Sequence, residues 1–180
     1  MSYKSHEALL EHLGLPTKPD PSLPVLDLAC GTGRSGLKLA YRNIPVVFAD
    51  RSAAALDGIR QHLSDNTLPG RVWQVDLEQT DVNPFGVQVF SAVICFRYLH
   101  RPLFPAILQA VEPGGLVIYE TFTTENLRFG RPGNPDFLLH TGELITWFKG
   151  WEVLHYYEGV QHEPERAIAQ LVARKPMLSS

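Results

Sequence analysis

The sequence predicts an α/β fold: a seven-stranded, mostly parallel sheet, with its last strand antiparallel, covered by helices on both faces. Three observations support this prediction. Short, nearly continuous apolar runs alternate with segments of helical spacing, as in parallel sheets that are buried on both faces. A glycine-rich turn at residues 31–36 joins the first apolar run to the first helical segment. Two further runs near the end of the chain are joined by a loop too short for a parallel crossover.

The parallel part of the sheet is predicted from five apolar runs, at residues 25–29, 44–49, 72–75, 87–95 and 116–119. Helices are expected between them at 34–41, 53–63 and 102–111. Ser52 suits the N-cap of the second helix, and prolines stand near the start of the third. Residues 112–115, Glu-Pro-Gly-Gly, form a predicted turn before the fifth run.

The end of the chain predicts a helix followed by a hairpin. The helix is expected to start at Thr141 or Gly142 and to end before Gly150, because glycine is common just past a helix end. Strands are expected at 151–157 and 167–173. Their short connection makes them antiparallel neighbours.

The length of 180 residues suits one domain. A short helix at 3–13, followed by a proline-rich stretch, predicts an N-terminal flap over residues 1–23. Residues 24–176 would form the main domain. Within it, 123–139 has no strong helix or strand pattern, and we expect this loop to be a lid over the substrate.

Composition excludes several classes of protein. Hydrophobic residues make up 44% and charged residues 19%, which is typical of globular rather than disordered chains. The 16 basic and 19 acidic residues give a net charge of −3, which argues against a nucleic-acid partner. No apolar run approaches the ~20 residues that span a bilayer, and no signal peptide is recognisable, so we expect a cytoplasmic protein without a membrane partner. Cys30 and Cys95 form no zinc-binding pattern, and no metal is expected. The oligomeric state is left open.

The glycine turn and three acids point to a nucleotide cofactor. Residues 31–36 read GxGxxG, and Asp50 stands at the end of the second run, which is the pattern of dinucleotide-binding folds. Asp27, inside the first strand, would repel a pyrophosphate but suits the ammonium and sulfonium of S-adenosylmethionine (SAM). Asp50 can accept the ribose hydroxyls, and Asp76, after the third run, can accept the adenine amino group. The three acids therefore predict SAM as the cofactor.

These residues resemble those of a class I SAM-dependent methyltransferase, a Rossmann-like fold. The resemblance rests on Asp50 and on residues 25–33, 75–76 and 112–115. Within that class, the chain is similar to the tellurite-resistance methyltransferase family. The stretches that carry this second similarity are residues 27–37, 137–144, 150–153 and 171–175.

The resemblance implies which residues hold the cofactor. Asp27 would orient the amino group of the methionine part, and Asp50 would bind the ribose. Arg51, Asp76 and Leu77 would contact the adenine. The backbone of Cys30, Gly31 and Gly33 would line the glycine turn. The backbone carbonyls of Phe96 and Arg97 would lie near the ammonium.

Methyl transfer from SAM is an in-line displacement that depends more on alignment than on a catalytic base. Candidate acceptor-binding side chains follow the fourth strand, lie on the fifth or lie in the 123–139 loop: Arg97, Tyr98, His100, Arg101, Tyr119, Glu120, Arg128, Arg131 and Asn134. They predict a pocket for a small, anionic or soft-nucleophile acceptor, such as a thiol, a chalcogen oxyanion or a carboxylate. His100 is a candidate general base. As the alternative, Arg97 and Arg101 form ordinary ion pairs with Glu120, Glu125 or Asp136.

Two other functions stay open. A methyltransferase of RNA or protein would need a basic face that the net charge does not reveal. A non-enzymatic nucleotide-binding module, for example for NAD, would need to tolerate Asp27 beside a pyrophosphate.

Overall fold

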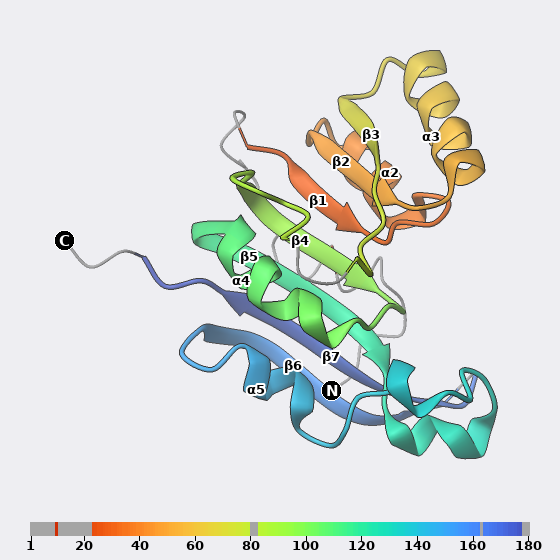
Figure 1. The fold of residues 1–180 in the computed structure, drawn as a ribbon, viewed down its shortest axis with the longest axis vertical. Helices are drawn as coiled ribbons and strands as arrows, with labels where there is room; N and C mark the ends of the chain where they lie inside the picture. The colour runs from red at the N-terminus through yellow and green to blue at the C-terminus, as the bar shows by residue number, and fades with distance from the viewer. Residues whose placement is uncertain (1–9, 11–22, 80–82, 163, 178–180) are drawn as a thin grey trace.

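A computed structural model describes Leu10 and residues 23–79, 83–162 and 164–177 (Figure 1). The expected N-terminal flap and its helix lie outside the described residues, apart from Leu10 and residue 23. Leu10 is buried among apolar side chains of the main domain.

Seven strands form one sheet, with the order β3-β2-β1-β4-β5-β7-β6. The strands are β1 (Val25–Leu28), β2 (Val46–Asp50), β3 (Gly70–Gln74), β4 (Phe90–Phe96), β5 (Val111–Phe122), β6 (Glu152–Gln161) and β7 (Arg166–Arg174). The first five are parallel to one another. β7 runs antiparallel to both of its neighbours, β5 and β6. The predicted fold class is confirmed.

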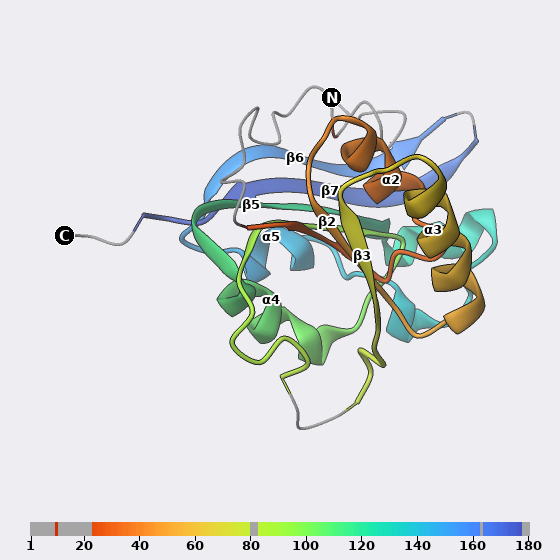
Figure 2. The same ribbon diagram turned by 90° about the horizontal axis from the view of Figure 1, so that it is seen from above.

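Helices cover both faces of the sheet, as Figure 2 shows. α2 (Arg34–Tyr41) and α3 (Ala53–Asp65) pack on one face, and α4 (Phe104–Ala110) and α5 (Glu143–Trp147) on the other. The expected cap of α3 is present, since the side chain of Ser52 accepts a hydrogen bond from the amide of Ala55.

Each face of the sheet has its own apolar core. On the α4 and α5 face, the ring of Phe104 stacks on those of Tyr119 and Trp147, with centroids 5.4 and 4.7 Å away. On the α2 and α3 face, Phe48 packs against Ile59 and other buried side chains. Burial of each such side chain stabilises the fold by about 1.5–3 kcal/mol. These two cores fix the sheet edge at which β1, β2 and β4 end.

Several predicted elements differ in extent from the observed ones; the strand expected at 151–157, for example, is Glu152–Gln161. The helix expected at 102–111 begins only at Phe104, after a 3-10 turn at Arg101–Leu103. The fifth strand, expected at 116–119, runs from Val111 to Phe122 and includes the predicted turn at 112–115. Backbone hydrogen bonds explain the extension, because the amide of Gly114 donates to the Lys175 carbonyl and the amide of Lys175 donates to that of Gly115, each at 2.9 Å. This pairing joins distant parts of the chain and leaves no local sequence signal.

The 123–139 segment is more ordered than its sequence predicts. It contains 3-10 turns at Thr124–Phe129 and Pro135–Phe137. Asn126 anchors it to the sheet: its side-chain oxygen accepts from the amide of Ala167 on β7, and its side-chain nitrogen donates to the Arg131 carbonyl.

Within the described residues, no helix is long and apolar enough to cross a bilayer.

Candidate cofactor and acceptor site

The glycine turn brings α2 close to the end of β1. Gly33 has a φ of 73°, a left-handed conformation that favours glycine. A Cβ on Gly36 would lie 2.6 Å from Asp27 Oδ2 and 2.5 Å from Phe48 Cε1, so that position has room only for glycine. The tight packing allows the Gly36 amide to donate a hydrogen bond to Asp27 Oδ2 at 2.9 Å.

Asp27 is a buried carboxyl group, with 3% of its surface exposed. Burial raises its pKa from 3.8 to about 8, with a further increase from nearby Asp50, while the hydrogen bond from Gly36 acts in the opposite direction. The side chain therefore holds a proton at neutral pH when no cation is beside it. A positively charged group bound next to Asp27 would favour the ionised form.

Backbone amides hold the carboxylates of Asp50, the last residue of β2, and Asp76, which follows β3. The carboxylate of Asp50 accepts from the amides of Gly31, at 2.8 Å, and Ser52, at 2.9 Å. Asp76 accepts from the amide of Glu78 at 3.0 Å. Both acids are thus fixed at the same sheet edge as Asp27.

Two adjoining cavities lie at this edge, and they share Ala29 and Arg97 in their linings. The small lobe, of about 240 Å³, is lined by four of the predicted cofactor residues: Asp50, Arg51, Asp76 and Leu77. The large lobe, of about 510 Å³, is lined by four others: Asp27, Cys30, Gly31 and Phe96. Gly33 is buried within the turn itself. The structure therefore brings the predicted cofactor residues together.

The candidate acceptor residues are more dispersed. Arg97 stands where the two lobes meet, and its amide donates to the Glu120 carbonyl at 2.7 Å. His100 lines a separate pocket of about 440 Å³, which shares Leu77 with the small lobe.

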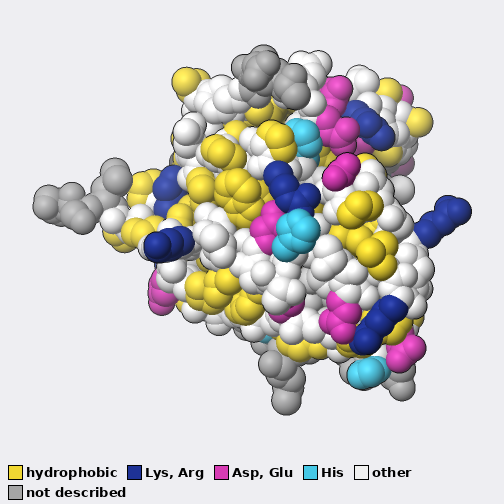
Figure 3. Space-filling view, turned by 60° about the horizontal axis from the view of Figure 1, so that its bottom comes forward, with side chains coloured by type: hydrophobic (Ala, Val, Ile, Leu, Met, Phe, Trp, Pro, Cys, Tyr) yellow, Lys and Arg dark blue, Asp and Glu magenta, His cyan; other side chains and the backbone are white. Residues whose placement is uncertain are grey.

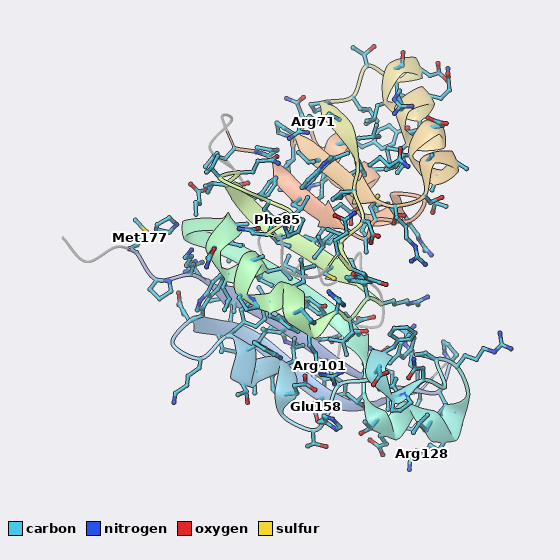
Figure 4. All side chains as sticks on the ribbon, in the orientation of Figure 1. Arg71, Phe85, Arg101, Arg128, Glu158 and Met177 are labelled. Carbon is cyan, nitrogen blue, oxygen red and sulfur yellow. The ribbon has the colours of Figure 1, made fainter. Side chains whose placement is uncertain are left out.

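Arg128 and Arg131 are not among the described residues that line either lobe. Arg128 Nη2 lies 2.9 Å from Glu125 Oε1, and its guanidinium covers the Phe129 ring. Figure 4 shows Arg128 on the outer side of its loop, pointing away from the sheet. Arg131 is exposed.

The ion-pair alternative is right only in that Arg101 forms an ion pair, and its partner, Glu143, is not one of the three expected acids. Arg128 rather than Arg97 or Arg101 pairs with Glu125. Arg101 pairs with Glu143, at 2.6 Å, and reaches Asp136 only through its backbone carbonyl. The buried side chain of Glu120 accepts a hydrogen bond from Gln170 at 2.7 Å.

Three basic side chains of the large lobe were missed at the sequence level: Arg34, Lys38 and Arg166. Arg34 and Lys38 are four residues apart on α2, so they share one face of the helix that follows the glycine turn. That spacing was an available signal. Arg166 starts β7, and nothing in the sequence predicts that this strand begins beside the turn.

Cys30 and Cys95 are both free thiols. Burial raises the pKa of each, that of Cys95 to about 12, with the hydrogen bond to Tyr119 acting in the opposite direction and Asp27 in the same one. Because the thiolate is the reactive form, neither cysteine is suited to act as a nucleophile.

Comparisons with known proteins agree with this geometry. A family model described as "Methyltransferase domain" matches residues 25–115. The chain is 28% identical over 104 residues to the "Uncharacterized methyltransferase YodH" of Bacillus subtilis, covering 56% of this chain and 43% of that protein. It is 25% identical over 146 residues to the "Probable S-adenosyl-L-methionine-dependent methyltransferase TehB" of Haemophilus influenzae, covering 76% of this chain and 48% of the relative. The chain thus spans about half the length of these relatives.

Among solved structures, TehB from Haemophilus influenzae superposes with a TM-score of 0.74 at 20% sequence identity. The superposition covers 97% of this chain and 63% of that one. At this identity the likeness speaks for the fold alone.

Proposed function

Because the chain belongs to the family of methyltransferase domains, with the class I fold that uses SAM as cofactor, we propose that it methylates a small, anionic or soft-nucleophile acceptor. The observation that carries this proposal is the two-lobed cavity at the carboxyl edge of the sheet. Its carboxylates match the groups of SAM, which has no phosphate to be repelled: Asp27 faces the large lobe, and Asp50 and Asp76 face the small one.

The bound cofactor would supply an activated methyl group on a sulfonium, and the protein's own residues would supply position. Asp27 would hold the ammonium of the methionine part in the large lobe. Asp50 would hold the ribose hydroxyls, and Asp76 and Leu77 the adenine edge, in the small lobe. Alignment and exclusion of water then suffice for a good nucleophile.

The charge of the large lobe supports an anionic acceptor. Four basic side chains from α2, β7 and the end of β4 line it: Arg34, Lys38, Arg97 and Arg166. Guanidinium groups bind oxyanions in bidentate fashion, and a selenium or tellurium oxyanion or a carboxylate offers that geometry. Among the candidate acceptor-binding residues, Arg97 is the best placed, because it lines both lobes.

Transfer of label from methyl-labelled SAM tests the proposal. The purified chain would be offered thiols, selenite and tellurite, carboxylates, and tRNA. We expect turnover with one of the small acceptors, and a higher KM for it in Arg97→Ala. Turnover with tRNA alone would contradict the proposal.

The lid prediction is tested with the same assay. If residues 123–139 close over the acceptor, Arg128→Ala or Arg131→Ala raises its KM. An unchanged KM in both variants would contradict that role.

The surface gives little support to an RNA substrate. On the face drawn in Figure 3, the described Lys and Arg side chains are scattered among acidic and apolar ones and form no continuous basic stripe. Salt-dependent binding of tRNA at physiological ionic strength would favour that alternative instead.

A further inference from the structure

Tyr98 carries a buried hydroxyl that has no hydrogen-bond partner in the part of the chain that the structure describes. A buried polar group without a partner costs free energy, and folded proteins satisfy most such groups. An orphaned hydroxyl beside a cavity is therefore a candidate for a ligand contact.

The side chain lies at the small lobe. Tyr98 follows β4 by two residues and lines this lobe together with Asp50, Asp76 and Leu77. Its backbone is fixed, because its carbonyl accepts a hydrogen bond from the hydroxyl of buried Tyr119 at 2.8 Å. The anchored backbone leaves the phenol as the part of Tyr98 that can serve a ligand.

The hydroxyl is a neutral donor at physiological pH. Burial raises the pKa of Tyr98, and the nearby carboxylates of Glu78 and Asp76 and the thiol of Cys95 raise it further, while Arg51 acts in the opposite direction. The group therefore keeps its proton and can donate it in a hydrogen bond.

A neutral donor in the small lobe would suit the adenine ring. Adenosine presents donors in its amino group and ribose hydroxyls, and acceptors in its ring nitrogens. The carboxylates of Asp50, Asp76 and Glu78 can only accept when they are ionised, so they suit the donors, and the ring nitrogens must be met by donors such as the Arg51 guanidinium, a backbone amide or the Tyr98 hydroxyl.

We propose that Tyr98 is a cofactor-binding residue whose hydroxyl donates a hydrogen bond to a ring nitrogen of the adenine. The inference rests on the proposed function, since it requires that the small lobe hold the adenosine part of SAM. Tyr98 lies outside the motifs of the glycine turn.

Calorimetry with S-adenosylhomocysteine and its 1-, 3- and 7-deaza analogues tests the proposal, since each analogue replaces one ring nitrogen by C–H. Tyr98→Phe should bind the parent ligand about 5- to 10-fold more weakly than the wild type. One deaza analogue should bind the wild type about 5- to 10-fold more weakly than the parent ligand does. Tyr98→Phe should bind that analogue and the parent ligand with the same affinity. The Tm of the ligand-free variant should stay the same or rise, because the variant removes an unpaired hydroxyl. A purely structural role would lower that Tm.

Tyr41→Phe is the matched control. The hydroxyl of Tyr41 lies 2.8 Å from Nε2 of His62, on an exposed part of the surface, and its loss should leave the affinity unchanged. Equal affinity of wild type and Tyr98→Phe, or one penalty common to all four ligands, would overturn the inference and leave the proposed function intact. A wild-type protein that binds none of the ligands would overturn both.

Discussion

Asp27 is the residue through which pH should act most directly on the site. Its carboxyl is buried beside the glycine turn, and its pKa is raised to about 8, chiefly by that burial. At neutral pH the ligand-free protein therefore holds a proton there. Binding an ammonium beside Asp27 would release that proton, because the ionised carboxylate then gains a partner.

The affinity for S-adenosylhomocysteine should therefore rise with pH up to about pH 8, the pKa of ligand-free Asp27, by at most about tenfold per pH unit. Asp27→Asn should bind more weakly and show no such rise. Calorimetry in two buffers of different ionisation enthalpy measures the released proton directly. An equal pH slope in both proteins would assign the proton to another group.

The ligand-free protein should show the opposite dependence. Between its pKa in the unfolded chain, 3.8, and its pKa in the folded protein, about 8, the Asp27 carboxyl binds a proton only in the folded state. The free energy of unfolding therefore falls as pH rises between these two values. The fall should be absent in Asp27→Asn, as urea titrations across the window would show.

At the scale of elements, Arg101 joins three segments: the 3-10 turn before α4, helix α5 and the end of the 123–139 segment. It stands at the first position of the 3-10 turn before α4, and its guanidinium donates to both oxygens of Glu143 on α5, at 2.6 and 2.8 Å. It also donates to the backbone carbonyls of Asp136 and Leu138, at the end of the 123–139 segment. Figure 4 shows Arg101 between α4 and α5. One side chain thus ties the loop after β4 to the proposed lid.

Arg101→Ala should lower the free energy of unfolding by about 2 kcal/mol, since charged hydrogen bonds are lost from a half-buried group. Arg174→Ala, which removes an exposed ion pair with Glu152, should cost less than about 1 kcal/mol. If urea titrations gave the same loss in the free energy of unfolding for both variants, the Arg101 contacts would stabilise the fold no more than an exposed ion pair does.

The dependence of the free energy of unfolding on acidic pH gives a second measure of the Arg101–Glu143 contact. Burial alone would raise the pKa of Glu143, but hydrogen bonds from Arg101, His140 and Trp147 hold it below 4.5. The stability that this pair contributes is present above that value and lost as pH falls through the lowered pKa. Arg101→Ala should therefore weaken the acid dependence.

The strands and acids of the site could be predicted from sequence because their signals are local. Parallel strands end at one edge, so acids at or near the ends of three such strands lie at the same edge of the sheet. The Arg101–Glu143 pair joins residues 42 positions apart, and Gly115 is drawn into β5 by Lys175; neither contact leaves a local pattern. The orphaned hydroxyl of Tyr98 is likewise visible only once the packing is known.

For the molecule as a whole, ligand binding should appear as thermal stabilisation. S-adenosylhomocysteine at about 100 times its Kd stabilises the folded state by about 2.7 kcal/mol, which for a chain of this size is a rise in Tm of about 5–10 °C. NADH should give no comparable shift, because it offers no ammonium for Asp27 to bind. A shift with NADH and none with S-adenosylhomocysteine would favour a dinucleotide-binding module.

The position of β7 has a consequence for how the chain assembles during synthesis. β6 is made before β7, yet it is hydrogen-bonded into the sheet only through β7, which lies between it and β5. During synthesis, β6 therefore has no strand partner in the sheet until β7 emerges from the ribosome. β7 can then pair with β5 on one side and with β6 on the other. We therefore expect β6 and β7 to join the sheet late, and a nascent chain halted before Arg166 to expose the open edge of β5.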